Sequence, residues 1–186
     1  MLQREVPQRI NIAVAAAAQA HGVPVVLDMG GEDLAMPDEL LKSLTLLSAN
    51  ETELARLAGA PTDTDAQVRE AALAVQARAN ASAGAQGQAQ KLHVLLTLGS
   101  RGALLLLPDG QFLQQAALPV PRVVDTTGAG DCFRGAFTAA YLERKPWAEC
   151  LRFASAAAAL CIQTKGAMPS MPMRADIDAL LQKQQA

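Results

Sequence analysis

The sequence predicts an α/β fold with a mostly parallel sheet and helices on both faces. Short apolar runs that suit buried parallel strands, such as residues 23–28 and 92–97, alternate with longer segments of helical periodicity. Polar turns that contain glycine follow several of the apolar runs. In such folds ligands collect beyond the carboxyl ends of the strands, so the residues that follow each strand are the first candidates for a site.

The first half of the chain predicts helices and strands in alternation. Residues 10–20 are rich in Ala and predict a helix that ends near Gly22, while residues 23–28 carry β-branched side chains and predict a strand closed by glycines. The other elements expected in this half are a short helix at 38–44, a strand at 45–48, helices at 51–57 and 65–79, and a strand at 92–97.

The second half begins with a hairpin signal, because Asp109-Gly110 separates the apolar runs 103–107 and 111–114. Residues 79–90 are of low complexity and predict a helix tail that runs into a tolerated surface loop without a function of its own. The remaining expected elements are a strand at 118–124 and helices at 129–143, 147–163 and 174–184.

Composition limits the class of protein. With 51% hydrophobic and 18% charged residues, the 186-residue chain reads as a single soluble, globular domain over 1–186. A net charge of −2 without a Lys/Arg cluster argues against a nucleic-acid partner, and no apolar run reaches the length of a membrane span. Three cysteines without a C-x-x-C pair suggest neither a disulfide framework nor a zinc site, and favour a reducing compartment.

The segment 125–131 is the most informative of the polar turns. An expected strand runs through Gly128, Ala129, Gly130 and Asp131 directly into a helix. Backbone N–H groups at a helix start form an anion site, which suits a phosphoryl group in transfer, and Asp131 beside them can accept the proton of an attacking hydroxyl. The alternative is a plain turn with Asp131 as a capping residue. No P-loop motif and no protein-kinase catalytic loop occurs.

Two other turns offer weaker signals. Asn50 and Glu53 follow a strand at i, i+3 spacing, which places them on one helix face, although they could equally cap that helix. Residues 97–102 could bind a nucleotide or form an ordinary glycine turn. Cys132, at the start of a helix, could have a depressed thiol pKa, but simple packing is the preferred interpretation.

Four segments together resemble the ribokinase (PfkB) family of carbohydrate kinases, in the family's order and spacing. They are 50–53 (NETE), 97–102 (TLGSRG), 125–137 (DTTGAGDCFRGAF) and 165–172 (KGAMPSMP), and residues 37–41 add a fifth likeness. The resemblance covers nearly all of the chain except residues 79–90. It implies a three-layer ribokinase-like fold, of which this chain would be the C-terminal portion, truncated at the N-terminus so that the lid and first strands are missing.

The resemblance also implies roles for single residues. Asp131 would be the catalytic base that contacts the sugar, Glu53 would orient magnesium through water, and Asn50 would touch the nucleotide phosphates. The anion hole would comprise Gly128, Ala129 and Gly130. ATP would further contact Thr97, Gly99, Ser100, Gly102, Gly130 and Ser155. Potassium would be surrounded by Asp125, Thr127, Cys161, Thr164, Gly166 and Ser170, several through carbonyl oxygens. Ser155 could instead be a small residue of a packed helix, and Cys161 a core residue.

The function implied is ATP-dependent phosphorylation of D-ribose to ribose 5-phosphate. A fructokinase- or adenosine-kinase-like activity and a non-catalytic nucleotide-binding fragment are the alternatives. Because the sugar-binding region of the family would precede Met1, the isolated chain is expected to bind ATP weakly, to phosphorylate little sugar and to expose a sheet edge that favours association. A homodimer of the full-length enzyme and a cytoplasmic or plastid location are left open.

Overall fold

The computed structural model describes residues 1–30, 34–82 and 92–184, which contain seven α-helices and one six-stranded sheet. The strands follow one another in the sheet in sequence order. The elements are β1 (Leu2–Gln3), α1 (Gln8–Ala20), β2 (Val26–Asp28), α2 (Asp38–Leu41), β3 (Leu46–Asn50), α3 (Glu51–Ala58), α4 (Asp65–Ser82), β4 (His93–Thr97), β5 (Ala103–Leu106), β6 (Phe112–Gln115), α5 (Ala129–Leu142), α6 (Trp147–Cys161) and α7 (Arg174–Lys183), with short 3-10 helices η1 (Gly99–Arg101) and η2 (Met168–Ser170).

The contacts within the chain define two compact units, and the division passes through β5 and β6. The first unit comprises Met1–Thr97 and Leu105–Phe112, and the second comprises Leu98–Leu104 and Leu113–Ala186. Strands β1–β4 and helices α1–α4 therefore belong to the first unit, and helices α5–α7 to the second.

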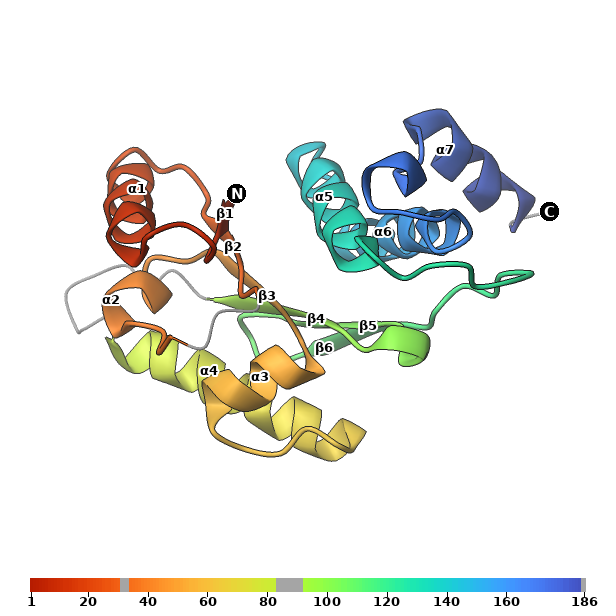
Figure 1. Ribbon diagram of the computed structural model, residues 1–186. Coiled ribbons are helices and arrows are strands. Elements are labelled where there is room, and N and C mark those ends of the chain that lie inside the picture. Colours follow the sequence, from red (N-terminus) through yellow and green to blue (C-terminus); the bar gives the residue numbers. More distant parts are fainter. Residues whose placement is uncertain (31–33, 83–91, 185–186) are drawn as a thin grey trace. The chain divides into compact units, whose positions relative to one another are not determined.

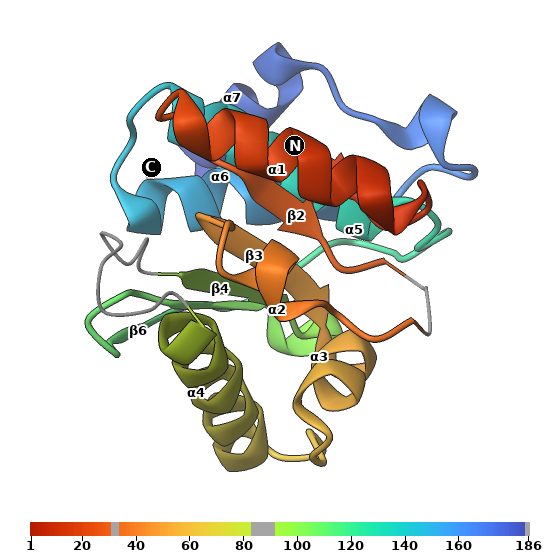
Figure 2. The same ribbon diagram turned by 90° about the vertical axis from the view of Figure 1, so that its left-hand side faces the viewer.

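The first unit is built on parallel strands. β1 pairs with β2, β2 with β3 and β3 with β4, all in parallel, and the central strands bury Leu27, Leu47 and Leu96 completely. Figures 1 and 2 show α3 and α4 together on one side of these strands and α1 on the other. The predicted parallel sheet with helices on both faces is confirmed, because strands buried on both sides read as continuous apolar runs.

Helix α4 shows how the sequence pattern directs packing in this unit. Val68, Ala72, Val75 and Ala79 recur at helical spacing and are each at most 3% exposed. From the same face the amide nitrogen of Gln76 donates to the carbonyl oxygens of Leu92 (2.7 Å) and Leu107 (3.0 Å). These bonds satisfy a buried polar group and tie the helix to the residue before β4 and the residue after β5.

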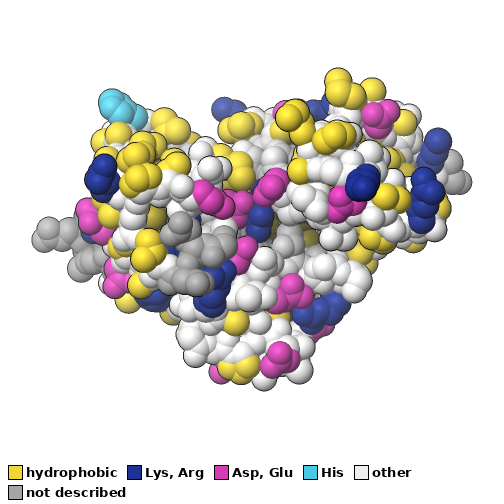
Figure 3. Space-filling view, viewed as in Figure 1, with side chains coloured by type: hydrophobic (Ala, Val, Ile, Leu, Met, Phe, Trp, Pro, Cys, Tyr) yellow, Lys and Arg dark blue, Asp and Glu magenta, His cyan; other side chains and the backbone are white. Residues whose placement is uncertain are grey.

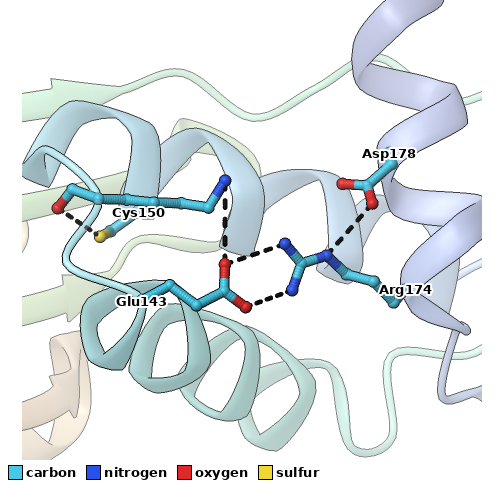
Figure 4. Close-up of polar contacts among 5 residues, drawn as sticks. Glu143, Cys150, Arg174 and Asp178 are labelled. Carbon is cyan, nitrogen blue, oxygen red and sulfur yellow. Dashed lines mark hydrogen bonds and ion pairs between the residues drawn. The ribbon is translucent and has the colours of Figure 1, made fainter.

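The second unit packs its helices through apolar and aromatic side chains. Phe137 of α5 lies between Phe133 and Trp147, with ring centroids 6.4 and 6.1 Å away. Helix α7 is fixed near the turn between α5 and α6 by Arg174, which donates two hydrogen bonds to the carboxylate of Glu143 at 2.5 and 3.0 Å (Figure 4). The guanidinium also lies 4.7 Å from the ring centre of Phe153.

Two expectations about strands need correction, and one is confirmed. Residues 118–124 are not a strand, because Pro119 and Pro121 lack the N–H donors that a ladder requires. The short strand β1 was not expected. The hairpin at Asp109-Gly110 is present, with Leu107 N–H bonded to the Gln111 carbonyl at 2.8 Å. Residues 79–82 of the low-complexity segment belong to α4, and 83–90 lie outside the described residues.

Candidate active site

Asn50 and Glu53 form a reciprocal cap at the start of α3. The Asn50 side-chain oxygen accepts the Glu53 N–H, while the backbone and side-chain nitrogens of Asn50 donate to the two carboxylate oxygens of Glu53, all at 2.9 Å. This is a capping box, so the capping alternative raised by the sequence is confirmed. With Glu53 only 6% exposed, these bonds fix the orientation of its carboxylate.

The strand register brings candidate residues to one edge of the sheet in the first unit. Asn50 and Thr97, the last residues of β3 and β4, are direct partners across the two strands. Asp28 ends β2 and is the partner of Ser48, so a carboxylate that the sequence analysis did not select belongs to the same carboxyl edge. Its position as the last residue of an apolar parallel strand was the available signal.

Residues 98–102 form a tight turn in the second unit. Leu98 N–H donates to the carbonyl of Gly102 at 2.8 Å, and the tip residues Gly99 and Ser100 are exposed. Gly102 has a φ of +90°, and a Cβ there would lie 2.0 Å from the Gln115 carbonyl oxygen, so no other residue fits. The turn therefore has a fixed backbone and a tip that a ligand can reach.

Gly128 is the N-cap of α5, with a φ of +78°. The Ala129 N–H is directed to the carbonyl of Thr126 at 3.1 Å, whereas the N–H groups of Gly130 and Asp131 belong to the first turn, where an α-helix offers them no acceptor. These two N–H groups, at the positive end of the helix, suit an anion. The side chain of Asp131 beside them is 73% exposed and accessible to a substrate.

Arg134, one turn further along α5, is a residue of this region that the sequence analysis missed. Its side chain is 8% exposed, and its Nη1 lies 3.5 Å from the Asp131 carboxylate. The i, i+3 spacing of a basic and an acidic residue was the signal that could have found it.

Asp125 holds together the loop expected to surround potassium. Its carboxylate accepts the N–H of Thr127 at 2.9 Å and that of Gly166 at 2.8 Å, across a sequence separation of 41 residues. Hydrogen bonds from the Thr127 side chain, the Thr127 backbone and the Gly166 backbone lower the pKa of Asp125 to about 2. The carboxylate is therefore charged throughout the physiological range.

The residues expected around potassium in segment 161–170 are linked to one another through Cys161 and Ser170. The Ser170 hydroxyl donates to the Ala167 carbonyl at 2.7 Å and lies 3.1 Å from the Cys161 sulfur, and Thr164 N–H bonds the Cys161 carbonyl at 3.2 Å. The structure thus brings together the expected residues of the 125–127 and 161–170 segments. One carboxylate with hydroxyl and carbonyl oxygens is a donor set that fits a hard cation such as potassium.

Two candidate residues of the second unit, Cys132 and Ser155, are buried, and this burial supports packing roles for them. Burial, together with the neighbouring Cys161, raises the pKa of the Cys132 thiol to about 12, so the alternative of a depressed pKa is wrong. Ser155 is 6% exposed on α6 with buried alanines on either side, as expected of a small residue in a packed helix. Its contact with a nucleotide stays a prediction.

Residues 1–174 match the profile of the pfkB family carbohydrate kinases. The chain belongs to this family. This chain is 50% identical over 181 residues to a ribokinase of Arabidopsis thaliana. The match covers 97% of this chain and 45% of the relative. This chain is 30% identical to a ribokinase of Haemophilus influenzae, covering 94% of this chain and 52% of the relative.

Solved structures of ribokinases have the same fold as this chain. The structure of Arabidopsis thaliana ribokinase complexed with ribose and ATP matches with a TM-score of 0.88 and 48% identity, over 97% of this chain and 55% of that chain. A ribokinase from Thermotoga maritima matches with a TM-score of 0.78 and 28% identity, over the same 97% and 55%. The predicted family and fold class are confirmed, and the pfkB chain spans about half the length of these relatives.

The candidate residues of the pfkB chain fall into two groups, one in each unit. Asn50, Glu53 and Thr97 gather at the carboxyl edge of the first unit. The others belong to the second unit, in the 98–102 turn, the 125–131 segment, α6 and the 164–170 loop. None of the helices in the described part of the chain is both long and apolar enough to cross a bilayer.

Proposed function

We propose that this chain carries the ATP-binding and phosphoryl-transfer machinery of a ribokinase, which moves the γ-phosphoryl group of ATP to O5 of D-ribose. The observation that carries the proposal is the turn from Gly128 into α5, which leaves the N–H groups of Gly130 and Asp131 without an intrahelical acceptor. A carboxylate that is 73% exposed stands directly beside these donors.

This geometry suits the chemistry. Phosphoryl transfer spreads negative charge over the equatorial oxygens of the migrating group, and N–H donors at a helix start stabilise such charge. Asp131 would take the proton of the attacking hydroxyl as the new P–O bond forms. A strong base is not needed, because positioning and electrostatics supply most of the rate in this reaction.

The other residues take the roles that the resemblance implies. Asn50 would touch the nucleotide phosphates, and Glu53, oriented by its cap, would hold a water of magnesium. The exposed tip of the 98–102 turn, Thr97 and Ser155 would contact the nucleotide. The oxygens around Asp125 would hold potassium, which would keep the Gly128 turn in shape through Thr127.

Ribose as the substrate rests on the likeness to ribokinases, one of which is described as complexed with ribose and ATP. We also propose that residues 1–186 form a single domain, that the full-length enzyme is a homodimer, and that it lies in the cytoplasm or in a plastid. Since the chain spans about half of its relatives, we expect little ribose-dependent turnover from the 186-residue chain by itself.

The test uses a chimera in which this chain replaces the matching part of the Arabidopsis thaliana ribokinase. We expect ribose-dependent ADP formation, and a loss of about 10²–10⁴-fold in kcat for Asp131→Asn, which removes the proton acceptor. Glu149→Gln is the matched control, because Glu149 is an exposed acid at the third position of α6 as Asp131 is of α5. An Asp131→Asn chimera that keeps its rate would refute the role of Asp131.

The choice of sugar is tested separately with the native protein that contains this chain and with this chain alone, because the sugar-binding region of the chimera would come from the Arabidopsis thaliana ribokinase. Ribose, 2-deoxyribose, fructose and adenosine are offered at equal concentrations with ATP. Ribose is expected to be phosphorylated with the highest kcat/KM. A preference for fructose or adenosine would overturn the assignment of ribose while leaving the phosphoryl-transfer machinery intact, and ATP binding without turnover of any acceptor would favour a nucleotide-binding module.

A further inference from the structure

The segment 168–173 exposes three thioethers to solvent. Met168, Met171 and Met173 are 84%, 39% and 73% exposed, and Met1 is the other exposed methionine, at 61%. Methionine ordinarily fills gaps in apolar cores, so three exposed thioethers within six residues do not serve that purpose. The cysteines of the chain, in contrast, are all buried. The thioethers of this segment are therefore sulfur atoms that a small oxidant in water reaches easily.

One of these thioethers also covers the turn at the start of α5. A Cβ at Gly128 would lie 3.1 Å from Met171 Cε and 3.2 Å from Ala167 Cβ, so the Met171 methyl group packs over this glycine. Gly128, at a φ of +78°, is the N-cap through which the chain enters α5. The contact is apolar on both sides, and the Met171 sulfur is one bond away from it.

The backbone around Met171 leaves it little freedom to move away. Met171 N–H donates to the Met168 carbonyl and Ser170 N–H to the Ala167 carbonyl, both at 3.3 Å. Pro172 follows, and a proline favours the extended conformation that Met171 has, at φ −64° and ψ 117°. A polar atom added to the sulfur must therefore be accommodated at the contact with Gly128.

Small molecules can reach the sulfur from a cavity of about 490 Å³ that Met171 and Met173 both line. Its other walls come from α6, η2 and α7, through residues such as Leu160, Ser170 and Leu180. Hydrogen peroxide is a small, uncharged molecule that resembles water in size and polarity. It can therefore enter wherever water enters this cavity.

We propose that Met171 is a site of reversible oxidation by peroxide, and that its sulfoxide loosens the Gly128 turn. The sulfur lone pair forms an S–O bond with one peroxide oxygen while the O–O bond breaks, and the second oxygen leaves as water with both hydrogens. The sulfur loses two electrons, which reduce the peroxide. Because the new oxygen is polar and needs hydrogen bonds, it turns towards water and draws the methyl group away from Gly128.

The state of this turn can be measured without a ligand. The N–H groups of Ala129 and Cys132 donate to the carbonyls of Thr126 and Gly128 at 3.1 and 2.9 Å, and their hydrogen exchange reports on opening of the turn. A looser turn would also lower the affinity of this helix start for phosphate, a consequence that rests on the proposed function.

The experiment treats the native protein that contains this chain with hydrogen peroxide and then with dithiothreitol, which reverses thiol oxidation but not sulfoxide formation. Mass spectrometry locates the sulfoxides. We expect the methionines of segment 168–173 to be oxidised at least about tenfold faster than Met29 and Met36, which are each 3% exposed.

Hydrogen exchange is then followed by mass spectrometry in peptides that cover residues 126–134. We expect it to accelerate at least about fivefold, as for one unpaired polar group in a buried contact. Methionine sulfoxide reductases should restore the slow exchange. Peptides that cover β4 are the reference, because their exchange changes only if the protein unfolds as a whole.

Two variants assign the effect to one thioether. Met171→Leu keeps an apolar side chain of similar volume without sulfur, so its exchange over 126–134 should stay slow after peroxide. The double variant Met168→Leu, Met173→Leu is the matched control. It removes the two more exposed thioethers of the segment, and it should respond to peroxide as the wild type does.

Several results would overturn the inference and leave the proposed function untouched. If Met171 stays reduced while Met168 is fully oxidised, Met171 is not a modification site. If its sulfoxide forms without faster exchange over 126–134, or if Met171→Leu responds as the wild type does, this thioether does not hold the turn. If Met171→Leu does not fold, the double variant decides, since Met171 is then the one thioether of the segment, and an absent response would refute its role.

Discussion

The carboxylate of Asp125 joins two loops that are 41 residues apart in the sequence. One oxygen accepts the N–H of Thr127 and the other that of Gly166, so the start of the GAGD turn and the 164–170 loop share one anchor. Because these donors stabilise the charged form, the pKa of Asp125 falls from 3.8 to about 2. The anchor is thus an electrostatic one whose strength depends on pH.

This pKa predicts when the anchor is lost. A carboxyl group with a depressed folded-state pKa stabilises the fold above its unfolded pKa, and that contribution disappears as the pH falls through the folded value. We therefore expect the Gly166 amide signal to stay constant from pH 7 to 4 and to titrate with a midpoint of about 2. NMR measures this directly, and Asp125→Asn should abolish the transition. A midpoint near 4 would show that the hydrogen bonds do not stabilise the charge.

At the scale of elements, α7 is held by a buried apolar side chain, an ion pair and a hydrogen bond from Arg152 to the Leu181 carbonyl. Ile177, at 5% exposure, is the buried residue of this helix, and Arg174 pairs with Glu143 while also approaching Asp178 at 3.2 Å (Figure 4). The hydrogen bonds to Arg174 lower the pKa of Glu143. Since both partners of this pair are at least 41% exposed, water screens it, and the apolar contact is expected to dominate.

The prediction for α7 compares these two contacts. Ile177→Ala should destabilise the docked helix by about 2–5 kcal/mol, because it leaves a cavity as well as losing buried area. Arg174→Gln should have a clearly smaller effect. Hydrogen exchange of the α7 amides, with those of α5 as the internal reference, measures both. Equal acceleration by the two substitutions would mean that the ion pair matters more than its exposure suggests.

At the scale of the whole molecule, one face of α1 exposes apolar side chains to solvent. Ile10 and Val14 are one helical turn apart and are 45% and 46% exposed, and Val23 just beyond the helix is 51% exposed. Figure 3 shows hydrophobic side chains gathered over α1 at the upper left. Contiguous exposed apolar surface of this kind favours association between molecules.

We predict that the 186-residue chain associates reversibly as its concentration rises, through this face. Val14→Lys should lower the association, because it places a charge in the middle of the apolar surface. Leu142→Lys is the matched control, since Leu142 is also exposed, at 71%, but lies at the end of α5. Sedimentation velocity over a range of concentrations measures the effect. If both variants associate as the wild type does, α1 is not the contact surface.

The elements were largely predictable because their signals are local. The apolar runs of β2, β3 and β4, the Asp109-Gly110 hairpin and the helices were all foreseen to within a few residues. The apolar residues of 118–124 suggest a strand, but the two prolines of this segment prevent strand pairing. The GAGD turn was selected as a candidate because glycines at the start of a helix have few uses, and the roles of its residues stay predictions.

What the sequence determined by itself is therefore the alternation of strands and helices, the family and the candidate base Asp131, since each is written in neighbouring residues. Only the tertiary structure decided that Asn50 lies opposite Thr97, that Asp125 anchors Gly166, and that Arg134 occupies the space left by Gly130. The physical reason is that strand register and helix packing are set by the collective burial of apolar side chains. A polar contact between distant residues follows from that burial and carries no local signal of its own.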